Sequence, residues 1–175
     1  MGYISDVQLY RRLTQTAEVA EQWQLPRLSE GVSRRYFDWL EFAVGGFWQY
    51  LTQLAHLSGD TVIYFYDLYR AKDTRFDFYA NFGLFPVIEL SVEMTERQYL
   101  SGLRCEPGHL EGVTYVAAYT DEYLILPPSG KWHIHGAYEI EMGQLVSYVG
   151  LPAPEVFPHD FWSEEEALRR IHLLR

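Results

Sequence analysis

The segment 61–69 restricts the fold of this chain more than any other part of the sequence. It reads Thr-Val-Ile-Tyr-Phe-Tyr-Asp-Leu-Tyr, and β-branched and aromatic residues of this kind favour strands. The apolar run is nearly continuous, which is typical of a strand that is buried on both faces. We therefore predict a strand in a central position of a sheet.

Further strands are expected after this one. The segment 86–94 alternates strictly, with Ile88 and Leu90 on the inward face and Glu89 and Glu93 on the outward face. Three more runs, 113–119, 123–126 and 131–141, are separated by a polar turn at 120–122 and by a Pro-Pro-Ser-Gly turn at 127–130. These runs predict a small antiparallel meander.

Helices are predicted from apolar spacing and from capping signals. A first helix begins at the pattern Ser5-x-x-Gln8 and ends before Pro26. Apolar residues at steps of three and four predict a longer helix over 33–57, in which Gly45-Gly46 marks either a close approach by another element or a break between two helices. A short helix is expected over 95–103, and a final helix begins at the pattern Ser163-x-x-Glu166.

This order of elements predicts a single α+β domain over residues 1–175, with a mostly antiparallel sheet and the helices packed on one of its faces. The chain has 175 residues, of which 48% are hydrophobic, enough for one proper core. No apolar run reaches the roughly 18 residues of a membrane span, and polar residues interrupt the N-terminus where a secretory signal would be apolar. We expect a cytoplasmic location without membrane contact. The one cysteine, Cys105, forms no internal disulfide, and we favour inert packing over a nucleophilic role for it.

The formal net charge of −10 is informative about partners. An acidic surface repels phosphate backbones, so nucleic-acid binding is not expected. The same field attracts basic proteins and accelerates their encounter, although it also simply keeps a protein in solution.

Two groups of residues are candidates for partner binding. The segment 70–85 interleaves charged and aromatic residues, a mixture that binding hot spots favour, although its rings could equally lie in the core. Its candidate contacts are Arg70, Arg75, Phe76, Phe78 and Tyr79. The second group is Glu89 and Glu93, which share a strand face without a basic residue and could form an acidic patch.

A metal site is an alternative. His133 and His135 should project from one strand face, and with Glu139 they could ligate a divalent metal. The spacing His-x-His-x-x-x-Glu resembles part of the first metal motif of the cupins over seven residues, but Pro127 stands where that motif has glycine. The face could instead be a solvated strand face, and helical spacing from Tyr138 to Val149 could place Glu139 on a helix.

No phosphate-binding loop, nucleophile elbow or Cys-x-x-Cys pair is present in the sequence. We therefore expect a protein-binding module without a cofactor that takes a basic partner, for instance an immunity protein that neutralises a toxin. The alternatives are a metal-dependent enzyme that uses His133, His135 and Glu139, and a structural subunit that self-associates through the segment 70–85.

Overall fold

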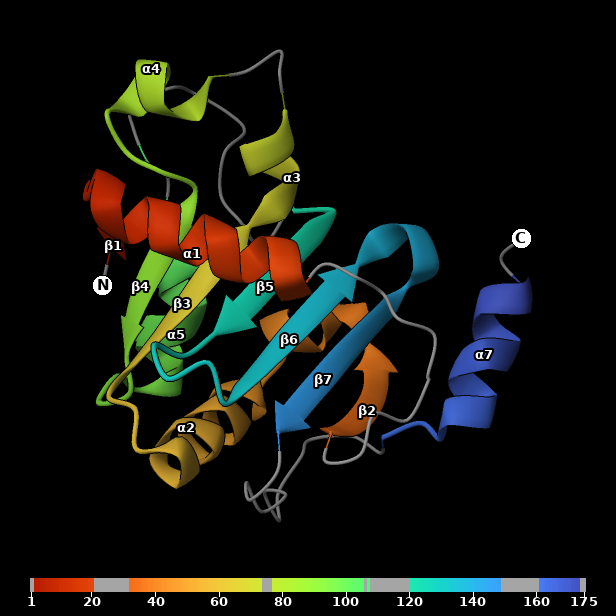
Figure 1. Ribbon diagram of the computed structural model, residues 1–175. Coiled ribbons are helices and arrows are strands. Elements are labelled where there is room, and N and C mark those ends of the chain that lie inside the picture. Colours follow the sequence, from red (N-terminus) through yellow and green to blue (C-terminus); the bar gives the residue numbers. More distant parts are fainter. Residues whose placement is uncertain are drawn as a thin grey trace.

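A computed structural model describes residues 2–20, 32–73, 77–105, 107, 120–148 and 161–173. Its centre is one seven-stranded antiparallel sheet with the strand order β1-β4-β3-β5-β6-β7-β2 (Figure 1). The strands are β1 (Gly2–Tyr3), β2 (Val32–Asp38), β3 (Val62–Asp67), β4 (Val87–Ser91), β5 (Glu122–Leu126), β6 (Trp132–Ala137) and β7 (Met142–Tyr148). The prediction of an α+β fold with an antiparallel sheet is confirmed.

Helices lie on both faces of this sheet, so the expected packing on one face is not confirmed. The helices are α1 (Val7–Ala20), η1 (Trp39–Ala43), α2 (Phe47–Ser58), α3 (Leu68–Lys72), α4 (Phe78–Phe82), α5 (Glu96–Gly102), η2 (Tyr138–Ile140) and α7 (Glu164–Leu173). In Figure 1, α1 crosses in front of β3 and β5, whereas α2 and α5 lie behind the sheet. We call these two sides the α1 face and the α2 face.

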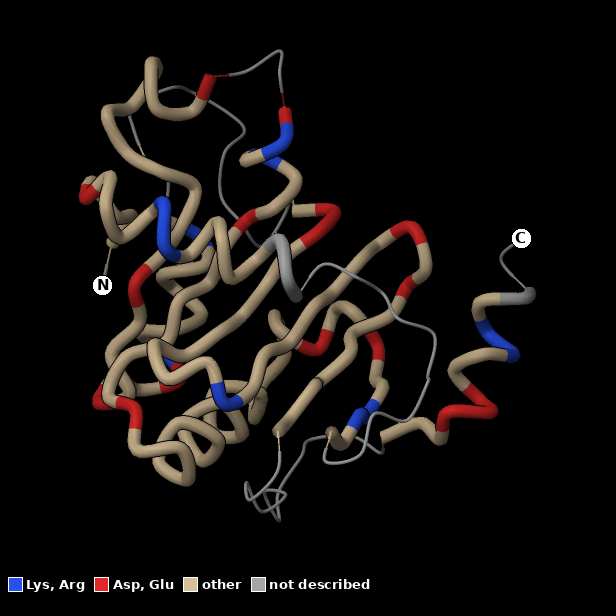
Figure 2. The backbone as a smooth tube through the Cα atoms, in the orientation of Figure 1, with Lys and Arg blue, Asp and Glu red and all other residues tan. Residues whose placement is uncertain are grey.

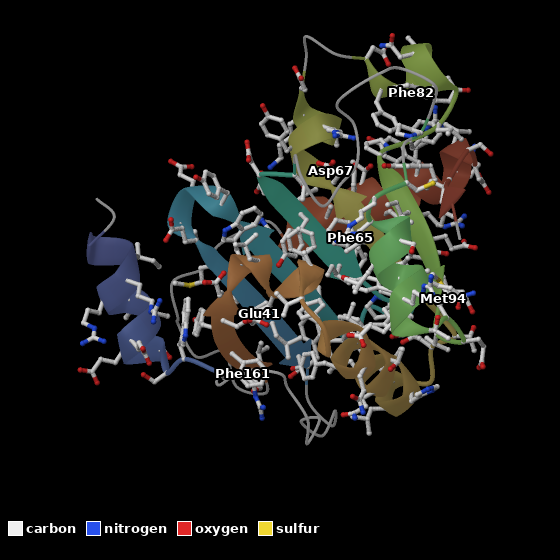
Figure 3. The ribbon with its side chains drawn as sticks, turned by 180° about the vertical axis from the view of Figure 1, so that it is seen from behind. Glu41, Phe65, Asp67, Phe82, Met94 and Phe161 are labelled. Carbon is white, nitrogen blue, oxygen red and sulfur yellow. The ribbon has the colours of Figure 1, made fainter. Side chains whose placement is uncertain are left out.

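The central strand β3 explains why both faces are covered. Side chains alternate along a strand, so Tyr64 and Tyr66 contact the core under α1, while Ile63 and Phe65 join the core under α2. Phe65 is completely buried, and Figure 3 shows it in the middle of the molecule. A strand that is apolar at both sets of positions needs cover on both sides, which confirms the central, two-sided burial expected for this segment.

The helix predicted over 33–57 is wrong in its first half. Residues 32–38 are strand β2, which pairs with β7 along its whole length, and the short 3-10 helix η1 follows. The α-helix α2 begins only after Gly46, which has φ 89°, so the break at the glycine pair is real. Leu40 and Val44, which the helical stripe would bury, are 48% and 39% exposed. The spacing of three and four therefore arose by coincidence from a strand followed by a bend.

The meander is confirmed for β5 and β6 and extends further than predicted. The segment 131–141 forms β6 only as far as Ala137, and the turn η2 then reverses the chain at Glu141, which has φ 47°. The helix considered for residues 138–149 is not observed, because Met142–Tyr148 is strand β7. The strand predicted over 113–119 lies outside the described residues.

Two glycines make this β6–β7 pairing compact. Gly136 and Gly143 lie opposite each other, and a Cβ at either position would clash with a ring, that of Tyr123 or that of Phe37. The two rings thus pack directly onto the backbone of the sheet on the α2 face.

Capping signals located the shorter helices well. Thr95 and Gln98 form the predicted capping box of α5, and Ser163 Oγ accepts a hydrogen bond from Glu166 N at the start of α7. The first helix is capped by Asp6 rather than by the Ser5 pattern, because Asp6 Oδ1 accepts hydrogen bonds from the backbone of Gln8 and Leu9. No helix in the described part of the chain is long and apolar enough to cross a membrane.

Candidate functional site

The two histidines singled out in the sequence do share one strand face, the α1 face. His135 belongs to a row of side chains that crosses six strands of the sheet in register. From β4 to β2 this row consists of Val87, Tyr66, Leu124, His135, Gln144 and Tyr36. His133 lies in the parallel row beside Val146 and Arg34.

His133 is buried rather than solvated, with 8% of its surface exposed. Its ring packs against Tyr148 with the centroids 6.2 Å apart. Burial lowers the pKa of His133 to about 4, and the positive fields of His135 and Arg34 add to this effect. The imidazole is therefore neutral at pH 7, and the expected alternative of a solvated face does not describe it.

His135 is even more deeply buried, at 1% exposed, and it has a carboxylate partner that the sequence reasoning did not identify. A hydrogen bond of 2.9 Å joins His135 Nε2 to Glu122 Oε1, and Lys72 Nζ donates to Glu122 Oε2 at 2.8 Å. Because His135 and then Lys72 stabilise the ionised form, the pKa of Glu122 falls to about 2. The register could have suggested this pair, since Glu122 lies two residues before Leu124, the partner of His135.

Glu139 does not join the two histidines. It lies in η2, beyond the end of β6, and its side chain is exposed. Within the residues that the structure describes, no three His, Cys, Asp or Glu side chains form a group suited to a metal ion. The arrangement proposed for a cupin-like site is thus absent from the described part of the chain.

A second buried carboxylate, Asp67, ends β3 (Figure 3). Its Oδ1 caps α3 by accepting from Arg70 N, and it also accepts from the Thr120 hydroxyl at 3.1 Å. Arg70 Nε lies 3.4 Å from Oδ2. Burial nevertheless dominates and raises the pKa of Asp67 to about 6, against the opposing effect of Arg70.

Some of the exposed acidic residues lie at this same end of the sheet. The strand register places the end of β2, the start of β5 and the turn between β6 and β7 side by side, and Figure 2 shows acidic segments at each of them. Four exposed carboxylates occupy these positions: Asp38, Asp121, Glu139 and Glu141. None of the four forms an ion pair with any described residue, whereas the nearby Lys72 is engaged by Glu122.

Large apolar side chains lie among these carboxylates. Tyr138 is 51% exposed and Leu40 is 48% exposed. The Tyr138 ring contacts Trp39 edge to face, with the ring centroids 5.2 Å apart. Tyr138 N donates to Asp121 O at 2.7 Å, which holds η2 against the start of β5. We call these seven residues the rim patch: Asp38, Trp39, Leu40, Asp121, Tyr138, Glu139 and Glu141.

The partner-binding residues named from the sequence are scattered in the structure. Arg70 is 8% exposed and Phe78 is 4% exposed, so neither offers contact area, whereas Tyr79 is 52% exposed. Arg75 and Phe76 lie outside the described residues. The segment 70–85 contains α3 and α4, not only a loop. Glu89 and Glu93 are exposed, but Glu93 follows the end of β4 and lies at the opposite end of the sheet from the rim patch.

Cys105 is exposed, so the interpretation of this thiol as inert packing in the core does not describe it.

Comparison with known proteins yields no relative: no family model, no curated protein and no solved structure matches this chain.

Proposed function

We propose that this protein is a binding module for a basic protein, and that the rim patch is its contact surface. The observation that carries the proposal is the placement of three exposed or half-buried apolar side chains at the same end of the sheet as four carboxylates without ion pairs among the described residues. Interfaces commonly have this form, with aromatic anchors in the centre and polar groups around them.

The charge of the surface selects the partner. Carboxylates that lack a cation of their own complement Lys and Arg side chains on another molecule, and they accelerate the encounter with it. With a net charge of −10, the remainder of the protein adds to this attraction at long range. An immunity protein that occludes a basic toxin in the cytoplasm fits this description. A metal-dependent enzyme is less well supported, because Glu139 does not lie with the two histidines.

The contact surface differs from the one expected from the sequence, and this difference can be tested. Two double variants reverse the same number of charges: Glu139→Lys with Glu141→Lys in the rim patch, and Glu89→Lys in β4 with Glu93→Lys just after it, outside the rim patch. All four positions are exposed, so both proteins should fold. A partner is first isolated from cell extract on the immobilised wild-type protein at low salt, then identified and purified.

We expect a partner with an excess of Lys and Arg, and association that slows steeply between 0.05 and about 0.5 M NaCl. The rim variant should reduce the association rate constant by about tenfold or more, whereas the Glu89/Glu93 variant should reduce it only a few-fold through the loss of net charge. Tyr138→Ala should accelerate dissociation instead, because it removes an anchor rather than a charge.

Equal effects of the two double variants would show that only the overall field matters and would remove the rim patch from the proposal. A partner of acidic or neutral composition, or a complex that is insensitive to salt, would contradict the proposed function itself. Self-association through the segment 70–85 stays a prediction, and sedimentation of the purified protein at several concentrations tests it.

A further inference from the structure

A pocket of about 530 Å³ opens between α1 and the sheet, away from the rim patch. Leu124 and Leu126 of β5 contribute its apolar wall, and His133 and Tyr148 line its far side. From α1, Arg12 and Gln15 border it, and both residues are exposed on that helix. Its volume and its largely apolar lining match those of sites that bind small molecules.

His133 is the second observation that points to a ligand. It is more than nine-tenths buried and lines the pocket, yet its ring makes no hydrogen bond with any described residue. The ring nitrogens of His133 are not among the fully buried polar atoms of the described residues, so they can be reached from the pocket. A neutral imidazole offers one donor and one acceptor, so it can bind a polar group of a molecule that enters the pocket.

The charged residue at the border of the pocket indicates the charge of the ligand. Arg12 forms no ion pair within the described residues, and its guanidinium stands at the border of the pocket. A guanidinium group with spare donors at the border of a mostly apolar space favours an anion with an apolar body.

We propose that this pocket binds a small organic anion, with an aromatic or aliphatic body against the exposed ring of Tyr148 and a carboxylate or sulfonate toward Arg12. The proposal is independent of the function proposed for the rim patch, because the two surfaces share no residue.

A pair of fluorescent probes tests the proposal. One is 8-anilinonaphthalene-1-sulfonate, and the other is N-phenyl-1-naphthylamine, which has the same ring system without the charge. We expect one saturable site for the sulfonate. Arg12→Gln should weaken it by roughly three- to tenfold while leaving the neutral probe unchanged, since only the charge-assisted contact is lost.

Two further variants serve as controls. Arg11→Gln removes an equal charge from an adjacent, exposed position of α1 that does not line the pocket, so both probes should bind as before. Gln15→Trp places a large side chain at the border and should block both probes. In wild-type protein, the ring ¹⁵N signals of His133 should shift when the sulfonate is added, while those of the exposed His56 should not.

The proposal is overturned if no saturable binding occurs up to millimolar sulfonate. It is also overturned if Gln15→Trp leaves binding intact, or if Arg11→Gln and Arg12→Gln weaken it equally. Near-ultraviolet circular dichroism of each variant shows whether the tertiary structure is retained, so that loss of folding is not mistaken for loss of the site.

Discussion

At the scale of single residues, the pKa shifts of Asp67 and His133 make the stability of the fold change with pH in opposite directions. Asp67 has a raised pKa of about 6, so the folded state binds its proton more tightly than the unfolded state does. Its contribution to stability therefore grows as the pH falls from about 6 toward 3.8. Relative to Asp67→Asn, the wild-type protein should gain roughly 2 to 3 kcal/mol of unfolding free energy between pH 7 and pH 4. Urea unfolding at a series of pH values measures this difference, and a constant difference would contradict it.

His133 has the opposite effect. Its pKa falls from 6.5 to about 4 on folding, so its contribution is fully present above pH 6.5 and is lost as the pH falls through the folded value. Relative to His133→Gln, the wild-type protein should lose about 3 kcal/mol between pH 7 and pH 4. In the wild-type protein these two effects have opposite signs.

The sequence predicted which strand face the histidines occupy but not what they contact. Alternation along 131–137 was enough for the face, because it depends only on local geometry. The Glu122 partner of His135 depends on the register between two strands, and the burial of both rings depends on how α1 packs on the sheet. The rim patch combines residues from β2, η1, η2 and the start of β5, and no local pattern links these segments.

At the scale of secondary structure elements, the β6–β7 pair depends on two glycines. Gly136→Ala and Gly143→Ala each insert a methyl group into the ring of Tyr123 or Phe37, and both rings are fully buried and cannot move aside. We expect each variant to lose about 3 kcal/mol or more of unfolding free energy, above the usual cost of overpacking. Gly45→Ala is the control, because its Cβ would make only an ordinary contact of 3.5 Å with Glu96, and thermal unfolding distinguishes the three. Equal melting temperatures for Gly136→Ala and Gly45→Ala would count against the tight packing.

The same elements show where sequence reasoning succeeded and failed. The capping box of Thr95 and the composition of β3 are local signals, and both identified their elements correctly. For the segment 32–44 the predicted helix is wrong, because apolar spacing cannot distinguish a helix from a strand that bends into a 3-10 turn. Here pairing with β7 decides the outcome, through seven register positions that no local propensity encodes.

At the scale of the whole molecule, the formal net charge of −10 opposes the compact state, because like charges repel one another. The four carboxylates of the rim patch form no ion pair with a described residue. Neutralising two of them in Glu139→Gln with Glu141→Gln should raise the unfolding free energy by roughly 0.5 kcal/mol at low salt, and about 0.5 M NaCl should abolish the gain. The same change at Glu89 and Glu93 should have a smaller effect. Calorimetric melting at two salt concentrations measures both, and a gain that persists in high salt would require another explanation.

The pairing of β2 with β7 has a consequence for folding during synthesis on the ribosome. The strand β2 must wait, with its backbone groups hydrogen-bonded only to water, until the residues between the two strands, 39–141, and β7 itself have been made. The strands β5, β6 and β7 follow one another in the sequence, so they can pair as soon as they have been synthesised. Folding that depends on such non-local pairing takes on the order of milliseconds to seconds, and until then β2 is exposed to aggregation with other chains.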